Sequence, residues 1–277
     1  MSIDTNKLLI SSDFYSVQGE GISTGVPSYF IRLSHCNLRC GMSTEFLNNI
    51  RKQGPDALAD GEIFVGDLHG KGLATWTCDS TSQWAIRGES RDFRYLIDQW
   101  QEQKIYEDIL DGTIHLIWTG GEPTIPKQQQ AIVNFFNYWG SNEIVANVYN
   151  EIETNGTKVI SPELFNLLDQ INCSPKLSNA GMPRKMTRVP EAIERIMEHS
   201  NYQFKFVISK EEDLEEIFDD FINPFQMPLK NVICMPGLDS QENFHERTQW
   251  VLEMSKKYKF RGLTRLHISA WDKTLNV

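Results

Sequence analysis

Short runs rich in β-branched and aromatic residues recur along the chain, and most are followed by a segment with helical periodicity. Runs that are apolar almost throughout are typical of strands in a sheet covered on both faces. The predicted strands span residues 28–34, 114–120, 144–154, 169–175, 202–208, 231–235 and 264–269. The predicted helices span residues 90–110, 127–139, 161–169, 190–199, 211–221 and 241–258.

Regular alternation of strand and helix predicts a parallel sheet with right-handed crossover connections. Six or seven such units favour an α/β barrel, complete or partial, over a small open sheet. Functional residues of such barrels sit at the carboxyl ends of the strands. A functional site is therefore expected along that rim.

Five of the predicted strands end in polar or glycine-rich clusters. These clusters are Ser34-His35-Cys36, Thr119-Gly120-Gly121-Glu122-Pro123, Glu153-Thr154-Asn155-Gly156, Ser174-Pro175-Lys176 and Met235-Pro236-Gly237. One such end is ordinary turn chemistry. Five on the same rim indicate a site.

Residues 41–75 break this alternation, because they are rich in glycine and fit at most a short helix over 43–53. Structureless segments longer than about 15 residues are uncommon and usually functional or mobile. We interpret 41–75 as an insertion within a single domain that spans residues 1–277.

Composition excludes several classes of function. The chain has 277 residues, 40% hydrophobic content and a formal net charge of -10. The negative charge argues against a large non-specific nucleic-acid surface, which needs a basic stripe. The chain has no apolar run long enough to span a bilayer, and its beginning lacks the features of a secretion signal. A soluble, cytoplasmic protein without a membrane partner is expected.

Five cysteines in such a chain do not indicate a disulfide framework, which leaves buried thiols, a metal site or a catalytic thiol. Three residues separate Cys36 from Cys40, and Cys78 follows the insertion. Three thiolates fit an iron–sulfur cluster with one open iron, or a zinc site completed by another group. Cys173 and Cys234 lie inside predicted strands, where buried apolar roles are typical.

The cysteines and the strand ends resemble those of a known superfamily. CNLRC matches the first half of the CxxxCxxC motif of radical S-adenosylmethionine (SAM) enzymes, with 37 residues instead of two before Cys78. The chain resembles, more narrowly, the 7-carboxy-7-deazaguanine synthase family. The segments that carry this resemblance are FYSVQGEGISTGVPSYFIRLSHCNLRC (14–40), CDS (78–80), TGGEP (119–123), ETNGT (153–157), SPK (174–176), KFVISKEEDLEE (205–216) and Leu266-His267.

The resemblance implies a partial (β/α) TIM-like barrel of the radical SAM type, with the insertion in its cluster-binding loop. Cys36, Cys40 and Cys78 would bind a [4Fe–4S] cluster whose fourth iron binds SAM, and Ser80 would ligate Mg²⁺. The residues implied to contact SAM are Thr77, Gly120, Gly121, Glu122, Glu153, Thr154, Asn155, Ser174 and Lys176. Those implied to contact the substrate are Gln18, Glu20, Gly21, Arg32 and His267.

The implied activity is a radical ring contraction. 6-Carboxy-5,6,7,8-tetrahydropterin would become 7-carboxy-7-deazaguanine with loss of ammonia, on the route to queuosine and other 7-deazaguanine bases. SAM would act as a regenerated cofactor. A flavodoxin-like or ferredoxin-like protein would supply the electron, the enzyme would be a homodimer, and no direct contact with nucleic acid is expected.

Two other functions stay open. The chain could catalyse a different radical SAM reaction, or it could be a non-catalytic partner-binding protein on a degenerate barrel that uses residues 41–75. Single residues also have ordinary structural explanations. Ser80 could cap a helix, and Arg32 could form a structural salt bridge, because a charge in an apolar strand needs an anionic partner.

Overall fold

The computed structural model describes residues 4–40, 48, 78, 88–140, 145–237, 241–272, 274 and 276. The predictions for Thr77, for Ser80 and for the insertion at 41–75, apart from Asn48, lie outside the described residues. The account below concerns the described parts of the chain.

Nine strands within the described residues form one sheet in the order β3-β1-β2-β4-β5-β6-β7-β8-β9. The strands are β1 (Leu8–Val17), β2 (Pro27–Leu33), β3 (Glu89–Arg91), β4 (His115–Gly120), β5 (Asn150–Thr154), β6 (Gln170–Cys173), β7 (Tyr202–Ile208), β8 (Val232–Pro236) and β9 (Arg261–Gly262). β1 pairs antiparallel with both β2 and β3, and every pair from β2–β4 to β8–β9 is parallel. The predicted α/β class with a mostly parallel sheet is confirmed.

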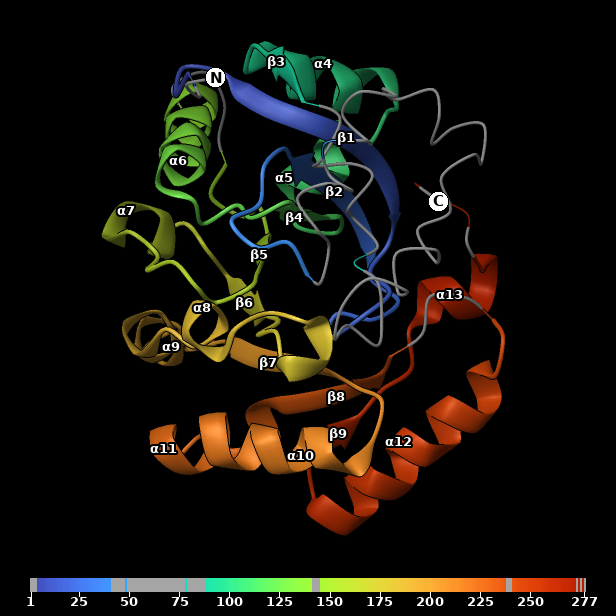
Figure 1. The fold of residues 1–277 in the computed structure, drawn as a ribbon. Coiled ribbons are helices and arrows are strands. Elements are labelled where there is room, and N and C mark those ends of the chain that lie inside the picture. The colour runs from blue at the N-terminus through green and yellow to red at the C-terminus, as the bar shows by residue number, and fades with distance from the viewer. Residues whose placement is uncertain are drawn as a thin grey trace.

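The helices follow the strands along the chain and cover the outer side of the sheet. They are α4 (Arg94–Glu102), α5 (Tyr106–Leu110), α6 (Pro126–Gly140), α7 (Pro162–Phe165), α8 (Arg184–Thr187), α9 (Pro190–Met197), α10 (Glu211–Ile217), α11 (Asn223–Phe225), α12 (Phe244–Tyr258) and α13 (Leu266–Trp271). Figure 1 shows the sheet curving from β1 to β9 with α6, α9, α10 and α12 outside it. β3 and β9 end the described sheet without pairing to each other, so the barrel is partial.

One strand prediction is wrong. Residues 264–269 alternate like a strand, but Leu266–Trp271 form helix α13. The backbone N–H of Leu266 donates to the carbonyl oxygen of Gly19 over 2.9 Å, and Ile268 is buried beside Phe244. These tertiary contacts with a distant turn outweigh the local strand preference of TRLHIS.

Other boundaries differ for local reasons. The helix predicted at 90–110 is two helices, because Lys104 between them has a left-handed φ of 60°. The strand predicted at 144–154 begins only at Asn150. β1 was not predicted, since Ser11, Ser12 and Asp13 interrupt its apolar pattern.

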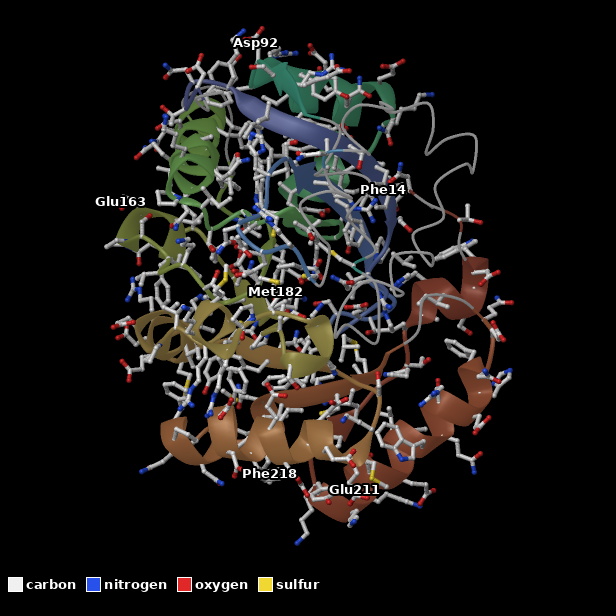
Figure 2. All side chains as sticks on the ribbon, viewed as in Figure 1. Phe14, Asp92, Glu163, Met182, Glu211 and Phe218 are labelled. Atoms are coloured by element: carbon white, nitrogen blue, oxygen red, sulfur yellow. The ribbon has the colours of Figure 1, made fainter. Side chains whose placement is uncertain are left out.

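The largest aromatic side chains fill the space between the sheet and helices α4 and α6. Trp100, Trp118 and Trp139 are all fully buried. The rings of Trp100 and Trp139 are 4.9 Å apart between centroids. Charged side chains such as Asp92 and Glu163 lie at the outer edge of the molecule instead (Figure 2). Among the described helices, none combines the length and the apolar character needed to cross a bilayer.

We predict that Trp139→Ala lowers the free energy of unfolding by about 3–5 kcal/mol, because it opens a large cavity in this aromatic cluster. Tyr138→Ala on the same helix is the control, since Tyr138 is 37% exposed, and should cost about 1 kcal/mol. Denaturant titration of both variants measures the difference. Equal losses would contradict the assignment of Trp139 to the core.

Candidate active site

The loop that follows β2 carries two of the predicted cluster cysteines. Cys36 is half-buried and Cys40 is buried with a left-handed φ of 43°. A hydrogen bond to the Cys78 side chain and burial hold the pKa of Cys40 well above its usual range. Burial, followed by the charge of Glu122, raises the pKa of Cys36 to about 12. The fold thus brings Cys78 to Cys40 across 37 intervening residues.

The three cysteines were tested against two kinds of metal site. Among the described residues, no three His, Cys, Asp or Glu side chains surround one point as the ligands of a single ion would. A [4Fe–4S] cluster needs a different arrangement, because each thiolate ligates a different iron. Cys40 contacts Cys78, and Cys78 also acts electrostatically on Cys36. This all-thiol set fits a cluster, whose binding must displace the thiol protons.

The turn after β4 packs directly against the cysteine loop. The backbone N–H of Gly121 donates to the carbonyl oxygen of Leu33, and that of Glu122 to His35, both over 2.8 Å. A Cβ on Gly121 would lie 1.9 Å from the His35 oxygen, and Gly120 has a φ of 103°. Only glycine fits both positions without moving the backbone.

Glu122 joins the ends of β4 and β5. Its side chain is 1% exposed, and burial raises its pKa while its hydrogen bonds oppose the rise. Oε1 accepts from Thr124 N (2.9 Å), Thr124 Oγ1 (2.5 Å) and Thr154 Oγ1 (2.7 Å), and Oε2 accepts from Asn155 N at 2.7 Å. These contacts make Glu122 a brace for β5. A contact between Glu122 and the SAM amino group stays a prediction.

The ETNGT segment after β5 is linked to the cysteine loop by side-chain amides. Asn155 Nδ2 donates to Asn37 Oδ1 over 3.1 Å and lies 3.9 Å from Cys36 Sγ. Asn37 Nδ2 donates to Thr157 Oγ1 over 2.7 Å, and Thr157 Oγ1 donates to Asn155 Oδ1 over 2.6 Å. Asn37 and Thr157 were not predicted as site residues, although Asn37 lies between the two cysteines of CNLRC.

The end of β6 adds a cation to this region. Ser174 N donates to the Thr154 carbonyl oxygen over 2.7 Å, and Lys176 Nζ donates to Ser174 Oγ over 3.1 Å. The Lys176 charge opposes the rise in the pKa values of Cys36 and Cys40 that burial and Cys78 cause. The two predicted SAM contacts that follow β6, Ser174 and Lys176, therefore lie near the thiols.

A second polar region lies inside the curved sheet, where the QGEG turn between β1 and β2 enters. Glu20 Oε1 accepts from Arg265 Nε over 2.8 Å, and Glu20 Oε2 accepts from Lys205 Nζ over 3.2 Å. Burial alone would raise the pKa of Glu20, but Lys205, Arg265 and His267 hold it well below its usual range. Glu20 is therefore an ionised carboxylate at neutral pH.

Glu153 on β5 extends the same network. Its Oε1 accepts from Lys205 Nζ at 3.0 Å and from Gln18 Nε2 at 3.2 Å, and its Oε2 accepts from Thr119 Oγ1 at 2.8 Å. Glu153 and Thr119 each precede a residue of the first region, Thr154 and Gly120. Glu153 therefore links the QGEG turn to the strand ends that carry Gly120 and Thr154.

The QGEG turn also contacts helix α13. A Cβ on Gly19 would lie 2.3 Å from His267 Nδ1, so this glycine allows His267 to approach the turn. Gly21 has a φ of 77°, and a Cβ there would lie 2.9 Å from Gln203 Nε2. The fold thus gathers four of the five predicted substrate residues, from Gln18 to Gly21 and His267.

Arg32, the fifth, projects from β2 as a half-buried side chain. Its guanidinium carbon lies 4.7 Å from the centroid of the Phe14 ring. Its Nη1 donates to Asn276 Oδ1 over 2.7 Å.

Two buried cations, Lys205 and Arg265, were missed by sequence reasoning. Lys205 carried a usable signal, because it is a charged residue within the apolar strand YQFKFVI. Arg265 carried none, because the strand predicted at 264–269 made its position uninformative.

A further buried carboxylate holds the far end of the QGEG turn. Glu151 is fully buried, and its Oε1 accepts from Ser23 Oγ at 2.8 Å and pairs with His115 Nδ1 at 2.5 Å. Its Oε2 accepts from Gln170 Nε2 at 3.0 Å and Asn172 Nδ2 at 2.8 Å. All of its oxygens are satisfied within the fold, so Glu151 anchors the turn through Ser23.

We predict that Gly121→Ala lowers the free energy of unfolding by at least about 2 kcal/mol, because the new methyl group must displace the backbone at His35. Gly140→Ala is the matched control. Among the described residues, a Cβ there meets Val145 Cγ2 alone, at an ordinary 3.6 Å, so its unfolding free energy should stay within about 0.5 kcal/mol of wild type. Denaturant titration compares them, and an unchanged Gly121→Ala would contradict the close approach.

The chain was compared with known proteins. No family sequence profile matches it. A 7-carboxy-7-deazaguanine synthase from Pyrobaculum aerophilum is 27% identical over 270 residues, covering 96% of both chains. Synthases of the same name from Rhodopirellula baltica and Aquifex aeolicus are each 25% identical over 95% of this chain, and cover 86% and 94% of their own.

The fold is similar to the crystal structure of QueE from Escherichia coli, with a TM-score of 0.57 and 19% identity over 94% of this chain and 95% of that one. The predicted partial barrel of the radical SAM type is thereby confirmed. With these relatives matching over nearly its whole length, the chain belongs to the 7-carboxy-7-deazaguanine synthase (QueE) family, a family of radical SAM enzymes.

Proposed function

We propose that this member of the family is an active 7-carboxy-7-deazaguanine synthase, a carbon–nitrogen lyase. One observation carries the proposal. The fold brings Cys40 into contact with Cys78, and it also gathers the polar side chains of Gln18, Glu20 and Glu153 into one hydrogen-bonded group. A barrel that had lost its catalytic function would not be expected to retain both the cysteine contact and this polar group.

Cys36, Cys40 and Cys78 would hold the [4Fe–4S] cluster. When bound, the cluster and SAM supply a one-electron cleavage that starts radical chemistry on the substrate. The residues proposed to hold SAM are Thr77, Gly120, Gly121, Glu122, Glu153, Thr154, Asn155, Ser174 and Lys176. Lys176 contributes a positive charge beside the thiols, and Asn155 steadies Cys36. Ser80 is proposed to ligate Mg²⁺ through its hydroxyl oxygen, a hard ligand suited to that ion.

The interior residues would bind and orient the pterin. Glu20, ionised and nearly enclosed, can accept hydrogen bonds from the amino and ring N–H groups of an aminopyrimidine edge. The forked guanidinium of Arg32 suits the substrate carboxylate. Gln18, Gly21 and His267 complete the proposed substrate contacts.

The reaction needs no external oxidant or reductant overall. The product equals the substrate minus one molecule of ammonia, so electrons and atoms balance. SAM can therefore be regenerated in each cycle. A flavodoxin-like or ferredoxin-like protein is proposed as the one-electron donor that primes the cluster.

We further propose a single domain over residues 1–277, a homodimer and a cytoplasmic location. These proposals rest on family membership, as does the role in queuosine biosynthesis. Residues 41–75 are proposed to be an insertion in the cluster loop.

The direct test is anaerobic turnover. We predict that the protein, reconstituted with iron and sulfide and supplied with SAM, Mg²⁺, dithionite and 6-carboxy-5,6,7,8-tetrahydropterin, releases 7-carboxy-7-deazaguanine and ammonia in equal amounts, as measured by mass spectrometry. A fully loaded cluster that cleaves SAM without forming this product would favour a different radical SAM reaction. A chain that binds no cluster would favour a non-catalytic role.

Cysteine substitutions test the ligand set. We predict that Cys78→Ala reduces iron and sulfide content and abolishes product, because the remaining two thiolates hold the cluster poorly. Cys234→Ala is the control, since Cys234 is fully buried in β8 and should keep its iron. Cluster absorbance and iron analysis provide the readout. A Cys78→Ala protein with a full cluster would remove Cys78 from the ligand set.

A further inference from the structure

Lys205 occupies an unusual position for a lysine. Its side chain is 3% exposed, on β7 within the concave side of the sheet. Burying an ammonium group is costly unless several acceptors satisfy it. Burial alone would lower the pKa of Lys205, but Glu153 and Glu20 raise it above its usual range. Lys205 is therefore a permanent buried cation.

The Lys205 ammonium bridges two carboxylates from different parts of the chain. Nζ lies 3.2 Å from Glu20 Oε2 and 3.0 Å from Glu153 Oε1. The other oxygen of Glu20 is held by Arg265 Nε at 2.8 Å. Lys205 and Arg265 thus pair with Glu20 and Glu153 in one connected group of side chains. Among the described residues, removal of Lys205 would leave Arg265 and His267 as the groups whose charge stabilises the Glu20 carboxylate.

The cations also fix the direction of Glu20. Lys205 contacts one carboxylate oxygen and Arg265 the other, so the group cannot rotate freely about its last bond. The backbone N–H of Glu20 donates to Gln18 Oε1 over 3.0 Å, which restrains the turn as well. A carboxylate accepts up to about four hydrogen bonds, so each oxygen keeps capacity for a further donor.

We propose that Lys205, supported by Arg265, is a positioning residue that holds Glu20 charged and aimed to accept hydrogen bonds from the N–H groups of the bound pterin. This inference rests on the proposed function. Lys205 acts through Glu20 and does not touch the reacting atoms. It adds to the substrate residues a cation that their own motif does not contain.

The inference gives a pH dependence with a definite sign. The charged and titratable groups around Glu20 are Lys205 on β7, Arg265 and His267 at α13, and Glu153 on β5. With Lys205 present, the pKa of Glu20 lies well below its usual range, so Glu20 stays charged from about pH 6 to 8. With Lys205 removed, only Arg265 and His267 of these groups still oppose burial, so the pKa of Glu20 rises. Pterin affinity should then fall as the pH decreases.

The experiment is anaerobic calorimetry of 6-carboxy-5,6,7,8-tetrahydropterin binding to the reconstituted enzyme with SAM and Mg²⁺ but no reductant. We predict that Lys205→Met raises the Kd at least about tenfold near pH 7, with a loss that grows toward pH 6. Wild-type Kd should be flat over the same range. Lys205→Arg, which keeps the charge, should recover most of the affinity and the flat profile.

Two further variants separate positioning from folding. Lys230→Met removes an exposed lysine and should bind like wild type. The double variant E20Q/K205M should bind no more weakly than E20Q alone, within about twofold, because Lys205 acts through Glu20. Iron content should be unchanged in Lys205→Met, which shows that the barrel is intact.

The outcomes distinguish the two levels of proposal. A wild-type enzyme that does not bind the pterin would overturn the proposed function, and the role of Lys205 with it. Wild-type binding combined with a Lys205→Met profile parallel to wild type would overturn the role of Lys205 alone. Independent losses in E20Q and Lys205→Met that multiply in the double variant would do the same.

Discussion

The backbone contact between the β4 turn and the cysteine loop is the constraint on which the site depends. Gly121 and Glu122 donate to Leu33 and His35, and this pairing continues the parallel register of β2 and β4 beyond the strands themselves. Two peptide chains can approach this closely only where one of them has no Cβ. This contact positions the cysteine loop and Glu122, and the hydrogen bonds of Glu122 in turn position the end of β5.

On the concave side of the sheet, ion pairs and hydrogen bonds stabilise the fold, as apolar packing does on the outer side. The outer side of the strands is filled by tryptophan and phenylalanine. The inner side carries Glu151 and Glu153 two residues apart on β5, each held by partners from neighbouring strands and from the QGEG turn. Buried carboxylates are tolerated when they are hydrogen-bonded or paired. The inner side of the sheet therefore carries carboxylates that the fold itself satisfies.

Sequence reasoning predicted much of this arrangement and failed for identifiable reasons. The parallel strands were predictable because both faces are buried, which leaves continuous apolar runs such as FVI in β7. The strand-end motifs were predictable because turn chemistry is local. The strand predicted at 264–269 was wrong, because helix α13 depends on a contact with Gly19, about 250 residues earlier in the chain. The partners of Glu20 were missed because ion pairs between distant parts of the chain leave no local periodicity in the sequence.

The meeting of Cys40 and Cys78 can also be considered as the closure of a chain loop. Closing a loop costs conformational entropy that grows only with the logarithm of its length, about 0.6 kcal/mol for each doubling. Lengthening the spacing from two residues to 37 would therefore cost at most about 2.5 kcal/mol, even for a chain without internal structure. A thiolate–metal site contributes folding free energy of a larger order, about 10 kcal/mol for zinc-finger peptides. A segment between two proposed cluster ligands could therefore lengthen at a thermodynamic cost smaller than the free energy that metal binding supplies.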